Sequence, residues 1–187
     1  YFDRGWCFTE QSWAGLTKAN YLSLDLGKMR AGKEYDCRSL VLDCTKAGGR
    51  GPPLQPSAFA AELETKSFTN GKDEKPLVKR LYKDAFEEQF GKATRLNYQL
   101  LGWGNAEAAQ LAAVLASGAA PRLETLLRSL FLDYNKIGDK GYTALAAALK
   151  EGAVPRLGRL VLGGNKIGDE GCKALTAALK EGAAPSL

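Results

Sequence analysis

Two near-copies of one unit fill the C-terminal part of the sequence: "LFLDYNKIGDKGYTALAAALKEGAVPRL" at residues 130–157 and "LVLGGNKIGDEGCKALTAALKEGAAPSL" at residues 160–187. Asn135 and Asn165 occupy the same place in the two copies and stand 30 residues apart. A third, diverged copy, "LNYQLLGWGNAEAAQLAAVLASGAAPRL", precedes them at residues 96–123. Such a period indicates a repeat architecture, in which each unit buries its apolar face against its neighbours.

Each unit has the pattern of a short strand, a turn and a helix. Leu160 and Leu162 are two residues apart, the spacing of a strand that buries one face. The side-chain amides of Asn135 and Asn165 are expected to satisfy backbone groups inside the turn that follows the strand. Asp169 is expected to cap the helix after the turn.

The helix of the unit carries one apolar stripe and ends at a glycine. The stripe recurs at three- and four-residue spacing, through Cys172, Leu175, Ala178 and Leu179. Gly182 is expected to end the helix. Strand and helix are therefore predicted to enclose a core between them.

The pattern LxxLxLxxNxIGDxGxxALxxAL resembles the leucine-rich repeat of the ribonuclease-inhibitor type, which also occurs in NOD-like receptors and in the GTPase-activating protein of Ran. The resemblance covers residues 95–187, where it implies about three repeats, the first degenerate and the last truncated. It implies an α/β fold: a short solenoid with parallel strands inside and helices outside. Residues 1–94 are then expected to be a partial α/β segment with capping helices.

In such a repeat, the strand residues between the core leucines face the concave surface. By alignment they are Arg95, Asn97, Gln99, Ser129, Phe131, Asp133, Arg159, Val161 and Gly163. Phe131, flanked by Arg95 and Arg159 at equivalent positions, is the best candidate for a binding anchor, because aromatic and Arg residues dominate interface hot spots. The alternative is that these side chains are merely solvated surface residues.

Composition excludes several kinds of chemistry. The sequence contains no His, which excludes His-based nucleophile activation and His-ligated metal sites within this chain. Cys7, Cys37, Cys44 and Cys172 lack the spacing of a zinc site, so reduced thiols in a cytoplasmic or nuclear protein are expected. The net charge of +5 is spread thinly, without the dense basic stripe that nucleic-acid binding requires. We therefore expect no cofactor and no nucleic acid.

Residues 1–94 are predicted to combine helices with one strand. Residues 5–19 are predicted to form a helix, with Trp6 and Cys7 packing inward, and residues 21–27 a strand. Residues 28–56 are expected to be mostly loop, and Ser57 to cap a short helix that follows. A turn is expected at Asn70-Gly71. Residues 76–91 are predicted to form a helix that leads into the first repeat strand and shields its core.

The stretch "RGWCFTE" raises a second hypothesis. Its Trp6-Cys7-Phe8-Thr9-Glu10 segment resembles the "WCxxE" segment of Toll/interleukin-receptor-like (TIR) domains, whose NAD-cleaving members use this Glu as the catalytic carboxylate. Few residues precede Arg4, so the strand–loop–helix portion that forms a TIR nucleotide pocket is not in this sequence. The stretches "RGWCFTE" and "KSFTNGKDEKPLVKRLY" also resemble repeat proteins of single-celled algae, a resemblance that names no activity.

These observations favour a non-enzymatic protein–protein interaction scaffold that binds a partner on the concave face. Two alternatives stay open: a TIR-like NAD hydrolase or signalling domain that uses Glu10, and a regulator of a small GTPase by resemblance to the Ran activator. No apolar run in the sequence is long enough to span a membrane, and no secretory signal is present. The chain is expected to be a piece of a longer protein and to self-associate through the open end of its repeats.

Overall fold

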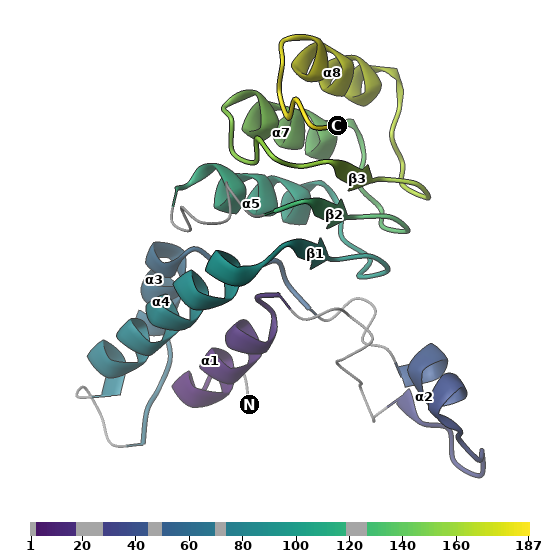
Figure 1. The fold of residues 1–187 in the computed structure, drawn as a ribbon. Coiled ribbons are helices and arrows are strands. Elements are labelled where there is room, and N and C mark those ends of the chain that lie inside the picture. The colour runs from purple at the N-terminus through teal and green to yellow at the C-terminus, as the bar shows by residue number, and fades with distance from the viewer. Residues whose placement is uncertain (1–2, 18–27, 45–49, 70–73, 119–126) are drawn as a thin grey trace.

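The computed structural model describes residues 3–17, 28–44, 50–69, 74–118 and 127–187 (Figure 1). Its N-terminal part contains the helices α1 (Gly5–Ala14), α2 (Cys37–Cys44), α3 (Pro56–Glu64) and α4 (Glu74–Lys92). Strands and helices then alternate, as β1 (Arg95–Asn97), α5 (Asn105–Ala116), β2 (Ser129–Phe131), α7 (Asp139–Lys150), β3 (Arg159–Val161) and α8 (Asp169–Lys180).

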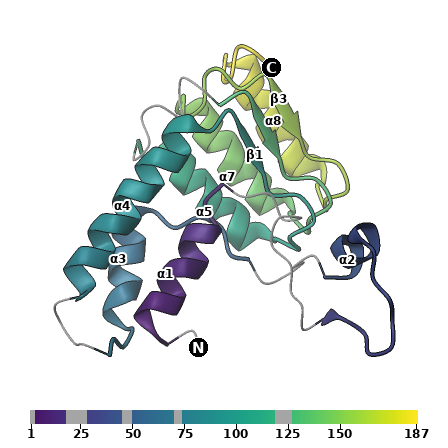
Figure 2. The same ribbon diagram turned by 60° about the horizontal axis from the view of Figure 1, so that its bottom comes forward.

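The strands of the described residues form a parallel sheet in the order β1-β2-β3. Leu96 is in register with Leu130, which is in register with Leu160. The helices α5, α7 and α8 lie side by side on one side of this sheet (Figures 1 and 2). The register of β2 with β3 therefore equals the 30-residue offset between the two sequence copies, and the predicted parallel strands are confirmed.

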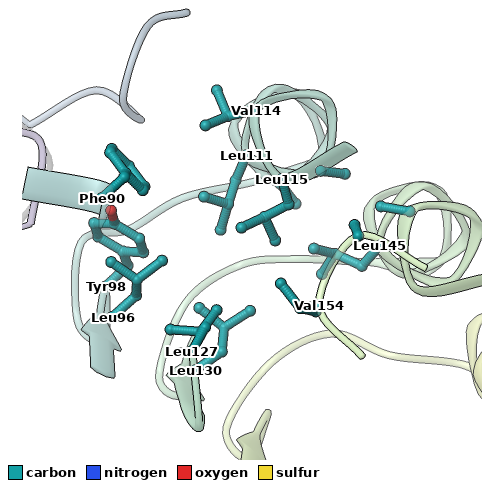
Figure 3. Packing of buried hydrophobic residues seen from close by; sticks show 14 of the residues in the cluster. Phe90, Leu96, Tyr98, Leu111, Val114, Leu115, Leu127, Leu130, Leu145 and Val154 are labelled. Carbon is teal, nitrogen blue, oxygen red and sulfur yellow. The ribbon is translucent and has the colours of Figure 1, made fainter. Parts of the chain in front are cut away.

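The core lies between the sheet and the layer of helices. Leu96 and Leu130 are buried on the strand side, where they point toward Leu111, Leu115 and Leu145 from the helices (Figure 3). Because alternate strand residues point to opposite faces, the residues on either side of these leucines face away from the helices.

The outermost helix, α8, departs from the predicted stripe. Leu179 is 42% exposed, whereas Leu149 at the same place in α7 is 4% exposed. Cys172 is likewise exposed, whereas its counterpart Tyr142 is buried. The difference arises because α8 covers α7, while no described helix covers α8.

Asn135 joins two neighbouring units through its side chain. Its Oδ1 accepts hydrogen bonds from the backbone N–H groups of Leu101 (3.0 Å) and Trp103 (3.1 Å) in the preceding unit. Its Nδ2 donates to the carbonyls of Tyr98 (2.8 Å) and Leu132 (2.9 Å). This buried amide therefore satisfies four backbone groups that no strand pairing reaches.

Asn165 makes the same kind of bridge one unit further along. Its Oδ1 accepts from the N–H of Ile137 at 3.1 Å, and its Nδ2 donates to the carbonyls of Leu132 (2.9 Å) and Leu162 (2.8 Å). The turns of successive units are thus fixed to one another as well as to their own strands.

The helix caps differ from the prediction, because they come from the neighbouring unit. Asp169 is the first residue of α8 and does not cap it. Instead, Asp139 Oδ1 at the start of α7 accepts hydrogen bonds from the N–H groups of Gly168 (2.7 Å) and Gly171 (3.0 Å) at the start of α8. We call this arrangement the inter-unit cap. It satisfies two of the donors that a helix N-terminus leaves unpaired, and it places a carboxylate where the helix dipole favours negative charge.

The same inter-unit cap joins α5 to α7. Asn105 Oδ1 accepts from the N–H groups of Gly138 (2.8 Å) and Gly141 (3.1 Å). No strand–helix unit precedes that of α5 among the described residues, and there Glu107 Oε2 accepts from the N–H of Gly104 at 2.7 Å within its own helix. Glu107 occupies the place that Gly141 and Gly171 hold in the later units.

The second glycine of each "IGDxG" motif is required by this close approach. A Cβ at Gly171 would lie 2.7 Å from Asp139 Oδ1 of the preceding unit. A Cβ at Gly141 would lie 3.1 Å from Asn105 Oδ1 of the preceding unit and 2.6 Å from Cγ2 of Ile137 in its own unit. These distances are shorter than ordinary non-bonded contacts. The motif therefore encodes the space into which the preceding unit inserts its cap.

The N-terminal helices pack through aromatic rings. Phe59 of α3 stacks between Phe8 of α1, at 5.1 Å between ring centroids, and Tyr82 of α4, at 3.7 Å. The inward packing predicted for Trp6 is wrong: this ring is 41% exposed, touches Phe68 edge-on and donates from Nε1 to Glu74 Oε2 at 3.3 Å. Phe8, and not Trp6, is the core residue of "RGWCFTE".

Buried contacts tie this part to the first unit. The hydroxyl of Tyr98 donates to the carbonyl of Leu16, and Trp103 Nε1 donates to the carbonyl of Arg50 at 2.7 Å. The guanidinium of Arg50 lies over the Tyr98 ring, 5.3 Å from its centroid, and donates to the Gly15 carbonyl. Burial lowers the pKa of Arg50 from its ordinary value and raises that of Tyr98, as expected for groups removed from water.

One prediction for residues 28–57 needs correction, and another gains a detail. The segment expected to be mostly loop also contains α2, where Asp36 Oδ1 accepts from the N–H of Ser39 at 2.7 Å while Ser39 Oγ accepts from the N–H of Asp36 at 3.1 Å, a reciprocal helix cap. Ser57 is not a cap, since α3 begins at Pro56, whose fixed φ suits a first helical position. The strand expected at residues 21–27 and the turn at Asn70-Gly71 lie outside the described residues.

We predict that Asp139→Ala lowers the free energy of unfolding by about 1–2 kcal/mol, because Gly168 and Gly171 lose their acceptor. Asp169→Ala is the matched control: this residue holds the same place in the next unit but is exposed, so a change within about 0.5 kcal/mol is expected. Urea unfolding followed by circular dichroism measures both. Equal losses in the two variants would contradict a stabilising role for the inter-unit cap.

Candidate functional site

The sheet face turned away from the helices brings the predicted binding residues together. Arg95, Ser129 and Arg159 are in register across the three strands, as are Asn97, Phe131 and Val161. We call these six residues the open sheet face. Arg95 and Arg159 are exposed, and the other four side chains are half-buried.

Phe131 stands between two guanidinium groups from the neighbouring strands. Cζ of Arg95 on β1 lies 4.7 Å from the centroid of the Phe131 ring, and Cζ of Arg159 on β3 lies 5.5 Å from it. Guanidinium groups over an aromatic ring are attracted by the ring quadrupole. Stacking of this kind uses no hydrogen bonds, so the N–H donors at the edges of both groups stay available to a partner.

Three of the predicted binding residues lie beyond the ends of the strands, and their burial differs from one to the next. Gln99 is half-buried and Gly163 is exposed, whereas Asp133 is only 8% exposed. The predicted surface position of Asp133 is therefore wrong: it lies past the end of β2, where the chain turns at Tyr134 with a φ of 54°. Within the described residues, Asp133 Oδ1 is buried without a hydrogen-bond partner.

The charge of the open sheet face is positive. Within the described residues neither Arg95 nor Arg159 forms an ion pair, in contrast to the paired charges on α4 and α8. Asp133 is the nearest acidic residue along β2, and it is buried. This arrangement suits an incoming group with negative charge and some apolar surface.

Glu10 lies far along the chain from this surface and has different surroundings. It is exposed on α1 and lines a pocket of about 330 Å³ together with Trp13, Ala14, Thr17 and Gln89. No second charged side chain is among the described residues that line this pocket. Catalysis of glycosidic cleavage needs groups that hold the substrate against the catalytic carboxylate, and a single solvated carboxylate does not provide them.

The described residues contain no group of three or more acidic or Cys side chains that could hold a metal ion. Among the same residues, no helix is both long enough and apolar enough to span a bilayer.

No sequence pattern indicates Arg50, whose side chain is buried at the junction between the N-terminal helices and the first unit. A pocket of about 330 Å³ lies beside it, lined by residues of α1 and α3 and by residues 50–54. Arg50 sits in a stretch rich in Gly, Lys and Pro without periodicity, so no pattern in the sequence singles it out.

Comparison with known families supports the interpretation of the repeats. Residues 125–146 and 157–175 each match a family model described as a leucine-rich repeat. These two segments contain β2 with the first part of α7, and β3 with the first part of α8. No curated protein matches the chain. The chain therefore contains two leucine-rich repeats, and β1 with α5 has the same strand–helix arrangement as they do.

We predict that Phe131→Ala lowers the free energy of unfolding by about 1 kcal/mol or less, because the ring is half-buried and contacts the exposed guanidinium groups of Arg95 and Arg159. Leu130→Ala, the adjacent residue on the opposite face, is expected to cost about 2–5 kcal/mol, because its side chain is buried in the core. Chemical denaturation of both variants measures the difference. A loss at Phe131 as large as that at Leu130 would mean that the ring is a core residue.

Proposed function

We propose that this chain is a protein-binding scaffold that holds a partner protein against its open sheet face. Leucine-rich repeats generally mediate protein–protein interactions, and the chain contains two. The observation that carries the proposal is the placement of Phe131 between Arg95 and Arg159, since aromatic and Arg side chains supply most of the binding energy in protein interfaces.

The proposal assigns different roles to the two parts of the chain. Residues 95–187 form a short solenoid of the ribonuclease-inhibitor type, and residues 1–94 cap its first unit. The contacts of Tyr98 and Trp103 with Leu16 and Arg50 support this division, because they cover the side of the first unit that no other unit covers. Glu107 also supports this division. It caps the start of its own helix, whereas the helices of the later units are capped by a residue of the preceding unit.

The proposed role is non-enzymatic and needs no cofactor. The thiols of Cys7, Cys44 and Cys172 are free, which supports a reducing compartment such as the cytoplasm or nucleus. The isolated position of Glu10 gives the TIR-like alternative no support from its surroundings.

We expect affinity capture with the purified chain to retain a set of proteins that Phe131→Ala no longer retains. Leu77→Ala is the matched control, because Leu77 is a large apolar side chain, 41% exposed, on α4 and away from the open sheet face. Quantitative mass spectrometry compares the three baits. The proposal fails if the two substitutions remove the same proteins, or if neither removes any.

A second proposal concerns the outer side of α8, which we infer to be a surface for self-association. Leu179 and Leu187 are 42% and 46% exposed, whereas their counterparts Leu149 and Leu157 are buried. Sedimentation velocity is expected to show an average mass that rises with concentration, and Leu179→Glu is expected to suppress this rise. A concentration-independent monomer would refute the inference.

A further inference from the structure

We infer that the open sheet face binds an acidic segment of a partner protein, one in which two carboxylates lie on either side of an apolar side chain. This inference rests on the proposed function and names the chemistry of its partner. It is drawn from three observations: the stacked guanidinium groups of Arg95 and Arg159, the half-buried ring of Phe131 between them, and the burial of Asp133, the acidic residue two places beyond Phe131.

The two arginines call for two separate anions. They lie on β1 and β3, two strand spacings apart, which places their backbones about 10 Å from each other. Two carboxylates, one at each guanidinium, pair both arginines while each stays stacked on the Phe131 ring. Each guanidinium presents the planar fork of donors that pairs with a carboxylate in a bidentate manner.

Phe131 supplies the apolar contact between the two charges. Alternate residues of an extended segment face the same side and lie about 6.5–7 Å apart. In a segment of the form Glu-x-Leu-x-Glu that crosses the three strands, the Leu side chain therefore meets Phe131 while the two Glu side chains reach Arg95 and Arg159. The ring excludes water from one side of both ion pairs, which strengthens them relative to fully solvated pairs.

Asp133 favours an acidic peptide over a nucleic acid. It is two residues beyond Phe131 along the chain, and its carboxyl group is buried. A phosphate backbone brings a regular row of negative charges, some of which would lie near Asp133, and needs a denser array of basic groups than the open sheet face has. A peptide brings its two carboxylates to the arginines and presents neutral groups elsewhere.

The experiment measures fluorescence anisotropy of a labelled peptide that contains Glu-Ser-Leu-Ser-Glu, with a Gln-Ser-Leu-Ser-Gln peptide as the matched neutral probe. Wild-type protein is expected to bind the acidic peptide at least about tenfold more tightly, with an affinity that falls as salt rises from about 0.05 to 0.5 M. Arg95→Gln and Arg159→Gln are each expected to weaken binding roughly three- to tenfold. Arg80→Gln, an exposed arginine on α4, removes the same charge elsewhere and is expected to leave binding unchanged.

Asp133→Asn gives a change in the opposite direction. Removal of its negative charge is expected to strengthen binding of the acidic peptide about two- to threefold. Thermal unfolding of each variant verifies that it is folded. Arg95→Lys keeps the charge but lacks the planar fork, so its affinity for the acidic peptide is expected to lie between those of wild type and Arg95→Gln.

The inference is overturned by equal binding of the neutral and acidic peptides, by an effect of Arg80→Gln as large as that of Arg95→Gln, or by tighter binding of a single-stranded oligonucleotide that depends on Arg95. These results differ from failure of the proposed function. If partner capture depends on Phe131 but the acidic peptide does not bind, the scaffold role stands and the partner has another chemistry. If the peptide binds through Arg95 and Arg159 but no protein is captured through Phe131, the scaffold role fails.

Discussion

The hydrogen bonds that link the start of one helix to the start of the next determine how the repeat region is built. Asp139 accepts from Gly168 and Gly171, and Asn105 accepts from Gly138 and Gly141. A helix N-terminus leaves backbone donors without a partner in its own helix, and here the neighbouring helix supplies the acceptor. Because that acceptor fits only where no Cβ intervenes, the glycines, the spacing of the units and the register of the strands are fixed together.

The open sheet face is a consequence of this fixed register. The cap bonds on the helix side and the amides of Asn135 and Asn165 at the turns hold each unit at one offset from the next. That offset puts Arg95, Phe131 and Arg159 within stacking distance although they are more than 25 residues apart along the chain. Any slip of one strand by a residue would turn these side chains into the core and expose the leucines.

Most of the repeat region could be predicted from sequence because its signals are local and occur more than once. Leu130 and Leu160 mark the strands, and Gly152 and Gly182 end the helices with φ values of 79° and 86°. The origin of the caps could not be predicted. A carboxylate at the start of a helix is normally expected to cap that same helix, and no residue within one unit indicates that it caps the helix of the next unit instead. Arg50 and the exposed ring of Trp6 were missed for a related reason: their positions depend on contacts between segments distant in sequence and not on any periodic pattern.

The inter-unit cap also makes the stack of units directional. At every junction one side contributes an acceptor and the other contributes glycine N–H donors, so the two sides are not interchangeable. At the outer face of α8, the exposed Asp169 provides the acceptor of a cap without the matching glycine donors. If two copies of this face met, their Asp169 carboxylates would face each other, and neither would have an N–H donor to pair with. A symmetric pair formed there would have to rely on apolar contact alone, whereas a unit that presents its glycines could join in one direction only.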